Sequence, residues 1–287
     1  MNYVSLNGKI QPGSEPVLLA GNRGYRYGDG LFETMKMVDG KIQLVNYHYE
    51  RLLSGLSLLQ FEIPKLFTPE KLQEEIITIC RKNECEQLAR TRLSVFRGNG
   101  GLYENNRSLQ YLIECWSLNA SVNKLNENGL VIDVYTGARK SCDQFSNLKS
   151  ANFLPYSMAA LYAKKNKLND CLVLNTHDRI CDSTIANLFW IKNGTIFTPA
   201  LPEGCVNGVM RRHLLKELEM AGYNVKQTTA AITDIENADE IFLTNAINGI
   251  RWVKQFRESI YSNIKTVEIF NQTGGSQNYS ASNQSGS

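Results

Sequence analysis

Three tight-turn dipeptides constrain the fold of this chain more than any other feature of its sequence. Asn7-Gly8, Asp39-Gly40 and Asn193-Gly194 each lie between two short stretches in which apolar and polar residues alternate. Asn-Gly and Asp-Gly readily adopt the backbone conformation that a two-residue β-hairpin turn requires. The sequence therefore predicts antiparallel hairpins at the start of the chain and again in its second half.

Helices are expected between these strands. Apolar residues at 49, 52, 53, 56 and 59 have the spacing of an amphipathic helix over 46–60. A second helix is expected from Thr68, a good N-cap, through Pro69 at the first helical position, to about Asn83. The remaining expected elements are helices at 150–166 and 209–221, and strands at 89–96, 109–116, 130–135, 171–175 and 240–244.

A polar segment divides the chain into two parts. Residues 117–128 contain few large apolar side chains and form the expected linker between an N-terminal α+β domain, 1–116, and a larger C-terminal domain, 129–270. Residues 271–287 are rich in Ser, Gln, Asn and Gly, and we expect a disordered tail. The length of 287 residues is sufficient for two domains of moderate size.

Composition excludes several classes of function. The formal net charge of +3 is too small to indicate binding to nucleic acid or to an anionic membrane. The apolar runs are shorter than the roughly 20 residues that span a bilayer, and the start of the chain does not resemble a signal peptide. The seven cysteines contain no CxxC motif and the three histidines are far apart, so no disulfide framework or metal site is expected, and free thiols favour the cytoplasm.

The segment Arg23–Thr34, RGYRYGDGLFET, combines three glycines with two arginines and two carboxylates. Glycines permit close approach of the backbone to a ligand, and the arginines are fixed cations, so the segment could bind an anion. A glycine-rich β-turn with solvated charges is the alternative interpretation.

Lys149 is a candidate reactive amine, because it precedes a predicted helix and has small and apolar neighbours in the segment Asn147–Leu154. A desolvated lysine has a lowered pKa and can form a Schiff base.

Two later segments offer groups for a charged ligand. Asp182 lies in a run of small, weakly polar residues that leads into a strand. The segment 203–211, EGCVNGVMR, places a glycine loop before a helix, where free backbone N–H groups and the helix dipole suit a phosphate. Thr244 and Asn245, at the end of a strand, could supply a second anion contact.

Taken together, six blocks of this sequence resemble the class IV aminotransferases over about residues 3–255. The blocks are RGYRYGDGLFET, HYERL, NLKSANFL, CDSTIANLFW, CVNGVMRRHLL and FLTNAINGIRWV. The family comprises branched-chain and D-amino-acid aminotransferases and 4-amino-4-deoxychorismate lyases, which use pyridoxal 5′-phosphate (PLP). The resemblance implies a two-domain, D-amino-acid-aminotransferase-like α+β and α/β fold with a β-barrel-like C-terminal domain. It also implies a homodimer in which a loop of the second subunit completes the substrate pocket.

The resemblance further implies roles for individual residues toward PLP. Lys149 corresponds to the Schiff-base lysine, which also moves a proton between Cα of the substrate and C4′ of the cofactor. Arg51 of HYERL and the backbone amides of Val209 and Met210 correspond to phosphate ligands, with Asn245 nearby.

Asp182 stands where the family usually has the glutamate that keeps the pyridine nitrogen protonated, which makes the ring a better electron sink. Because aspartate is one methylene shorter, either the ring lies closer or a water bridges the two groups.

The substrate pocket is expected on the N-terminal domain. Tyr27 and Phe32 resemble positions that line it, and Arg92 stands where relatives carry a cation for the substrate carboxylate. Arg90 precedes Arg92 by two residues and therefore lies on the same face of a strand. Weaker candidates for the carboxylate are Arg26 and Arg97.

The reaction itself has two readings. The first is transamination between an α-amino acid, of branched-chain or D type, and a 2-oxo acid. The alternative is 4-amino-4-deoxychorismate lyase, which expels pyruvate and leaves 4-aminobenzoate. Thr34 and the sequence of Arg97–Gly101 resemble the lyases, whereas the sequence of Gly249–Val253 resembles the transaminases. A binding protein with the same fold but without activity is a third reading, which the presence of Lys149 disfavours.

Overall fold

The computed structural model describes residues 2–104 and 108–273, which form two compact units. Unit 1 comprises the described residues up to 120 together with 148–152, and unit 2 comprises 121–147 and 153–273. The division at 120 falls within the polar segment 117–128. The return of 148–152 to unit 1 was not indicated by the sequence.

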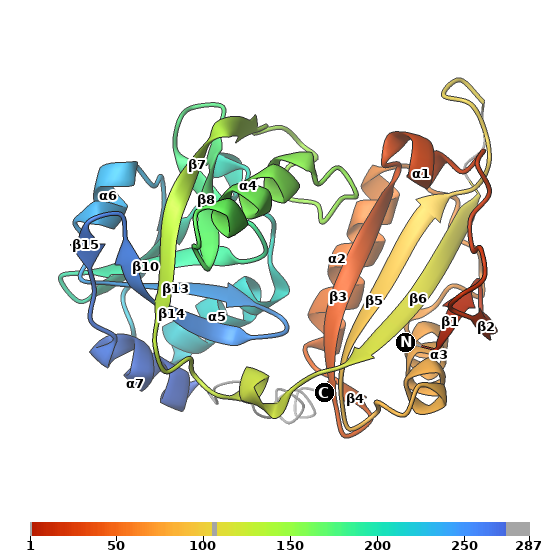
Figure 1. The fold of residues 1–287 in the computed structure, drawn as a ribbon, viewed down its shortest axis with the longest axis horizontal. Coiled ribbons are helices and arrows are strands. Elements are labelled where there is room, and N and C mark those ends of the chain that lie inside the picture. The colour runs from red at the N-terminus through yellow and green to blue at the C-terminus, as the bar shows by residue number, and fades with distance from the viewer. Residues whose placement is uncertain (1, 105–107, 274–287) are drawn as a thin grey trace. The chain divides into compact units, whose positions relative to one another are not determined.

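Unit 1 is built on one antiparallel six-stranded sheet (Figure 1). Its strand order is β2-β1-β6-β5-β3-β4, with β1 at Tyr3–Leu6, β2 at Lys9–Pro12, β3 at Gly30–Val38, β4 at Lys41–Ile42, β5 at Leu88–Arg97 and β6 at Leu109–Ser117. The predicted hairpins β1–β2 and β3–β4 are confirmed. Asn7 and Asp39 have positive φ angles of 51° and 46° at the two turns, as the turn type requires.

Helices cover one face of this sheet. They are α2 (Val45–Leu58) and α3 (Pro69–Lys82), and α2 runs alongside β3 in Figure 1. The short helix α1 (Arg23–Tyr27) contacts β5 and contributes no residue to the core beneath α2 and α3. The predicted cap of α3 is confirmed, because Thr68 Oγ1 accepts a hydrogen bond from the amide of Lys71 at 3.3 Å. Met35, Leu93 and Ile113 point from the sheet into the apolar core beneath α2 and α3. Since strand side chains alternate, the opposite face carries the even-numbered residues of β3 and β5.

Unit 2 contains a nine-stranded mixed sheet in the order β12-β11-β10-β13-β14-β7-β8-β9, with β15 paired to β14. Its strands are β7 (Leu130–Lys140), β8 (Asp170–Asn175), β9 (Ile180–Ser183), β10 (Asn187–Lys192), β11 (Thr195–Pro199), β12 (Val225–Thr228), β13 (Glu240–Asn245), β14 (Gly249–Phe256) and β15 (Ser259–Ile260). Its helices are α4 (Leu154–Lys165), α5 (Val209–Met220), α6 (Ile232–Glu236) and α7 (Ile264–Gln272). Short 3₁₀ turns lie at Leu201–Glu203 and at Ala120–Asn123, and the second of these spans the boundary between the two units in the sequence. The β10–β11 hairpin at Asn193-Gly194 is confirmed, and α4 lies beside β7 and β8 in Figure 1.

Three local expectations differ from the structure. Helix α4 begins at Leu154 rather than at residue 150, because 148–152 is extended and hydrogen-bonded to β3. Residues 23–27 form the short helix α1 instead of an open turn, since Asn22 Oδ1 caps the amide of Tyr25. Helix α7 runs to Gln272, beyond the expected start of the tail at 271; residues 274–287 lie outside the described part of the chain.

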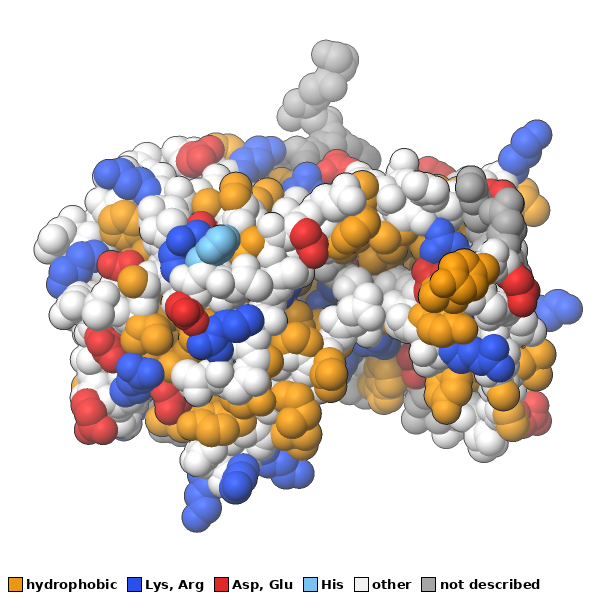
Figure 2. All heavy atoms as spheres, turned by 90° about the horizontal axis from the view of Figure 1, so that it is seen from above, with side chains coloured by type: hydrophobic (Ala, Val, Ile, Leu, Met, Phe, Trp, Pro, Cys, Tyr) orange, Lys and Arg blue, Asp and Glu red, His pale blue; other side chains and the backbone are white. Residues whose placement is uncertain are grey.

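The surface carries both signs of charge. On the face seen in Figure 2, basic and acidic side chains are interspersed among uncharged ones. Within the described residues, the helices are all too short or too polar to traverse a bilayer.

Candidate active site

A buried carboxylate on β3 holds Arg51 in unit 1. Glu33 Oε1 accepts a hydrogen bond from Arg51 Nε at 2.8 Å, and Oε2 accepts one from Arg51 Nη2 at 2.5 Å. His48, one helical turn before Arg51 on α2, places Nδ1 2.6 Å from Glu33 Oε2. The Arg51 guanidinium is thus oriented by a two-point contact, the geometry in which arginine binds oxyanions most specifically.

The charge states in this group follow from their surroundings. Burial alone would raise the pKa of Glu33, but Arg51 and His48 outweigh it and lower the pKa from its usual 4.5 to about 2. Burial lowers the pKa of His48, so its imidazole is neutral at pH 7 and its Nδ1 carries the proton donated to Glu33. Among the described residues, His48 Nε2 is buried without a hydrogen-bond partner.

Lys149 is positioned by strand-like pairing with β3. The amide of Phe32 donates to the carbonyl of Lys149, and the amide of Ala151 donates to that of Gly30, both at 2.9 Å. An isolated bridge pairs Leu31 with Ser150 between these two bonds. The Nζ of Lys149 lies 4.5 Å from the centre of the Phe32 ring. The reactive-lysine candidate therefore lies against the Phe32 ring, and not at a helix start.

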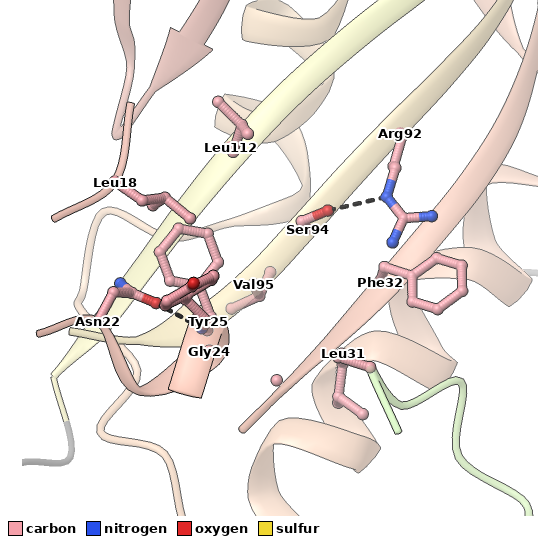
Figure 3. Close-up of a pocket in the computed structure, with 13 residues that line it drawn as sticks. Leu18, Asn22, Gly24, Tyr25, Leu31, Phe32, Arg92, Ser94, Val95 and Leu112 are labelled. Carbon is pink, nitrogen blue, oxygen red and sulfur yellow. Dashed lines mark hydrogen bonds between the residues drawn. The ribbon is translucent and has the colours of Figure 1, made fainter. Parts of the chain in front are cut away.

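A cavity of about 210 Å³ opens next to Phe32 (Figure 3). The Arg92 guanidinium carbon lies 3.8 Å from the Phe32 ring centre, and its Nε donates to Ser94 Oγ at 3.1 Å. Tyr25 lines the cavity on the α1 side, whereas Tyr27 is not among its lining residues and is 40% exposed. Phe32, Lys149 and Arg92 thus form a contiguous group in unit 1.

The neighbours of Arg92 lie on the same sheet face. Thr34 is the direct cross-strand partner of Arg92. Arg90 stacks on Trp116, with 5.5 Å between its guanidinium carbon and the ring centre. Glu114 Oε2 lies 4.0 Å from Arg92 Nε and balances part of the positive charge. A substrate anion at this face would therefore meet two arginines and one carboxylate.

The other arginines near the glycine-rich segment stabilise its loops. Arg23 Nε and Arg97 Nη1 both donate to Asp29, at 3.0 and 2.5 Å. Arg26 Nε donates to the carbonyl of Ala20 at 2.9 Å. An anion bound by these side chains would have to replace contacts that fix the loop, so Arg92 is the better candidate.

In unit 2, the Asp182 carboxylate is surrounded by donors. Oδ2 accepts hydrogen bonds from Lys140 Nζ at 3.2 Å, Tyr156 Oη at 2.7 Å and the amide of Val206 at 3.0 Å. Oδ1 accepts one from Asn187 Nδ2 at 2.9 Å. Burial and then the Asp182 charge raise the pKa of Tyr156 well above its usual 10, so this hydroxyl keeps its proton and remains a donor. The carboxylate is therefore rigid, and Oδ1 retains acceptor capacity for one more donor.

The start of α5 forms an anion cradle in the same unit. Gly208 occupies the N-cap and supplies no side-chain cap to the amides of Val209 and Met210. A Cβ on Gly208 would overlap Asn187 Oδ1, so only glycine fits here. Thr244, the strand partner of Asn187, buries a hydroxyl without a hydrogen-bond partner among the described residues. Uncapped amides at a helix N-terminus and an unsatisfied hydroxyl fit a phosphate group.

Unlike the Thr244 hydroxyl, the side-chain oxygen of Asn245 is engaged in hydrogen bonds. Its Oδ1 accepts hydrogen bonds from the amides of Ile247 and Asn248, at 3.0 and 2.8 Å, and so shapes the turn between β13 and β14. Sequence reasoning missed Glu33, which orients Arg51, and the partners of Asp182, which are Lys140, Tyr156 and Asn187. The only signal for Glu33 and Asn187 was a polar residue within an apolar strand.

Comparison with known proteins agrees with this fold. The sequence profile of the family described as Amino-transferase class IV matches residues 30–256. An aminodeoxychorismate lyase of Vibrio harveyi is 28% identical over 233 residues, covering 80% of this chain and 84% of that protein. A putative branched-chain-amino-acid aminotransferase of Methanocaldococcus jannaschii is 26% identical over 268 residues, covering 93% and 92%. The crystal structure of the Escherichia coli branched-chain amino acid aminotransferase superposes with a TM-score of 0.85 at 20% identity, covering 98% and 97%.

The chain therefore belongs to the class IV aminotransferase family, and it has the two-domain fold-type-IV architecture expected from its sequence. Members of this family are PLP-dependent enzymes that act as transaminases or as lyases.

Proposed function

We propose that this chain is a PLP-dependent aminotransferase that moves an amino group between an α-amino acid and a 2-oxo acid. The observation that carries the proposal is the placement of Lys149 and Arg92 on the same aromatic ring, with Nζ at 4.5 Å and the guanidinium carbon at 3.8 Å from the centre of Phe32. An α-amino acid carries its amino group and carboxylate on one carbon. It therefore needs the reactive amine and a carboxylate-binding cation close together.

Each unit, taken by itself, offers groups that suit PLP. Lys149 would hold the cofactor covalently, and Arg51 would bind its phosphate together with the amides of Val209 and Met210. Asp182 would accept a hydrogen bond from the protonated pyridine nitrogen. Bound PLP supplies an electron sink for the electron pair released when Cα loses its proton.

Side chains of this protein would transfer the proton, bind the substrate and exclude water. With PLP bound, Lys149 Nζ would be the group that accepts the proton from Cα of the substrate and passes it on. Arg92 binds the substrate carboxylate and keeps Cα in line with that amine. Phe32 covers one side of the lysine amine and excludes water from it.

A second candidate is 4-amino-4-deoxychorismate lyase, because Thr34 lies directly across from Arg92 with its hydroxyl on the substrate face. A hydroxyl there can donate a proton to a departing group. The Vibrio harveyi relative bears the lyase name, which supports the same alternative.

The deciding experiment offers the purified holoenzyme D- and L-amino acids with 2-oxoglutarate or pyruvate, and separately aminodeoxychorismate. We expect exchange of amino acid for 2-oxo acid. Formation of 4-aminobenzoate without such exchange would replace the first function by the second. The resemblance also predicts a homodimer, which sedimentation of the holoenzyme would test.

A further inference from the structure

Three cysteines, two near the end of α3 and one on β6, meet in the core of unit 1. Cys80 lies in the last turn of α3, Cys85 follows the end of that helix, and Cys115 lies on β6. Their three sulfur atoms are all within 4.8 Å of one another. Cys80 and Cys115 are 0% exposed and Cys85 is 4% exposed. None of the three is used in the proposed reaction.

The side chain of Asn83 holds the edge of this cluster. Its Nδ2 donates to Cys115 Sγ at 3.1 Å and to the carbonyl of Tyr3 at 2.9 Å. Its Oδ1 accepts hydrogen bonds from the amides of Asn2 and Tyr3, both at 2.9 Å. A fixed donor beside the sulfur stabilises a thiolate, the form that binds metals.

Backbone carbonyls add negative potential at the same place. Cys115 Sγ lies 3.6 Å from the carbonyl oxygen of Ile79, and Cys85 Sγ lies 3.6 Å from that of Cys80. Both carbonyls belong to the C-terminal end of α3, the negative end of the helix dipole, which stabilises cations. These carbonyls disfavour a bare thiolate, and a metal cation bound between the sulfurs would offset part of that cost.

We propose that Cys80, Cys85 and Cys115 bind a thiophilic metal ion through three sulfur ligands. Metal–sulfur bonds of about 2.3 Å bring ligand sulfurs to about 3.8–4.0 Å from one another, so the cluster needs to contract by less than about 1 Å. Binding releases the protons of the three thiols, and three metal–sulfur bonds replace three S–H bonds. No electron is transferred.

The number of ligands selects the class of metal. A structural zinc ion takes four ligands. Here the Oδ1 of Asn83 is already engaged by two amides, so the protein offers three sulfurs. Soft ions that accept three thiolates, such as monovalent copper and divalent cadmium, match this set.

The other buried cysteines provide an internal comparison. Cys171, Cys181 and Cys205 are also at most 1% exposed, but in the part of the chain that the structure describes they do not form a comparable group of ligands. They behave as small apolar side chains in the core of unit 2.

The test titrates the reduced holoenzyme with Cd²⁺, both after folding and during refolding, because the sulfurs are buried. We expect one Cd²⁺ per chain to survive desalting, an ultraviolet thiolate-to-cadmium charge-transfer band, and a higher Tm. Cys85→Ala and Cys115→Ala should each weaken binding at least tenfold. The matched controls Cys171→Ala and Cys142→Ser should bind as the wild type does.

Three results would overturn the proposal. They are absence of the band under both loading conditions, binding that survives in Cys85→Ala and Cys115→Ala, and binding that is lost in Cys142→Ser. If a variant fails to fold, protection of the three wild-type thiols from iodoacetamide by Cd²⁺, followed by peptide mass mapping, gives the same answer. Alkylation unchanged by Cd²⁺ would refute the site.

Discussion

Glu33 and Arg51 face each other through two parallel hydrogen bonds, Oε1 to Nε at 2.8 Å and Oε2 to Nη2 at 2.5 Å. Both side chains are almost fully buried, at 2% and 8% exposure. Since Arg51 is the proposed phosphate ligand, the direction of its guanidinium is set by a residue on the neighbouring strand β3.

The first prediction concerns the pH dependence of stability. The folded-state pKa of Glu33, about 2, lies below its usual 4.5, so its stabilisation is present above about pH 4.5 and is lost as the pH falls toward 2. The shift corresponds to roughly 3 kcal/mol. Glu33→Gln should remove most of this pH-dependent term, as measured by urea unfolding between pH 2 and 7. Equal acid sensitivity in the variant and the wild type would show that other groups dominate.

The second prediction concerns the buried pair of Lys140 and Asp182, whose side chains are 11% and 3% exposed. Lys140→Met leaves the carboxylate without its only cationic partner among the described residues. It should lower the free energy of unfolding by about 3 kcal/mol. In the double variant with Asp182→Asn the two losses should not add, since the unpaired charge is gone. Additive losses would indicate that the two groups do not interact.

Asp182→Asn alone gives the third prediction. An amide cannot hold the positive charge of the pyridine nitrogen, so turnover should fall by orders of magnitude while the affinity for PLP changes little. Absorbance titration with PLP separates the two effects. Wild-type turnover in this variant would remove Asp182 from the mechanism.

The fourth prediction concerns the start of α5. In Gly208→Ala, the added methyl group overlaps Asn187 Oδ1 and displaces a side chain that donates to Asp182. We expect weaker binding of PLP by at least tenfold, measured by equilibrium dialysis. Gly21→Ala is the control, because a Cβ there meets no atom nearer than 3.7 Å. Equal loss in both variants would point to general destabilisation.

The fifth prediction separates substrate binding from chemistry. Arg92→Leu removes a charge-assisted contact worth about 1.5–3 kcal/mol, so KM for the amino acid should rise by about 10- to 100-fold. Arg92→Lys should recover part of the loss. Arg81→Leu, which breaks an exposed ion pair with Glu86, should leave KM unchanged. An unaltered KM in Arg92→Leu would move the carboxylate site elsewhere, with Arg90 the next candidate.

The elements with local signals were predictable from the sequence. The Thr68–Pro69 start of α3 and the three hairpins depend on residues within a few positions of each other, and all are confirmed. The helix predicted from residue 150 was wrong in its start, because the pairing of Ser150 with Leu31 competes with helix formation and no local residue announces it.

The residues of the candidate site likewise divide into those that the sequence could identify and those that it could not. Lys149, Arg51 and Asp182 could be selected because their residue types and flanking motifs are distinctive. Glu33, Lys140 and Tyr156 could not, since what makes them important is a partner on another strand or helix. Hydrogen bonds between elements that are distant in the sequence leave no periodic pattern.

Residues 148–152 belong to unit 1, although the residues on both sides of them belong to unit 2. Cutting the chain once at residue 120 would leave the Lys149 segment attached to the C-terminal fragment and deprive β3 of its pairing partner. The two units are therefore not separable as independent modules by a single break. Lys149, the proposed Schiff-base lysine, should reach its place only late in folding, after chain closure between distant segments.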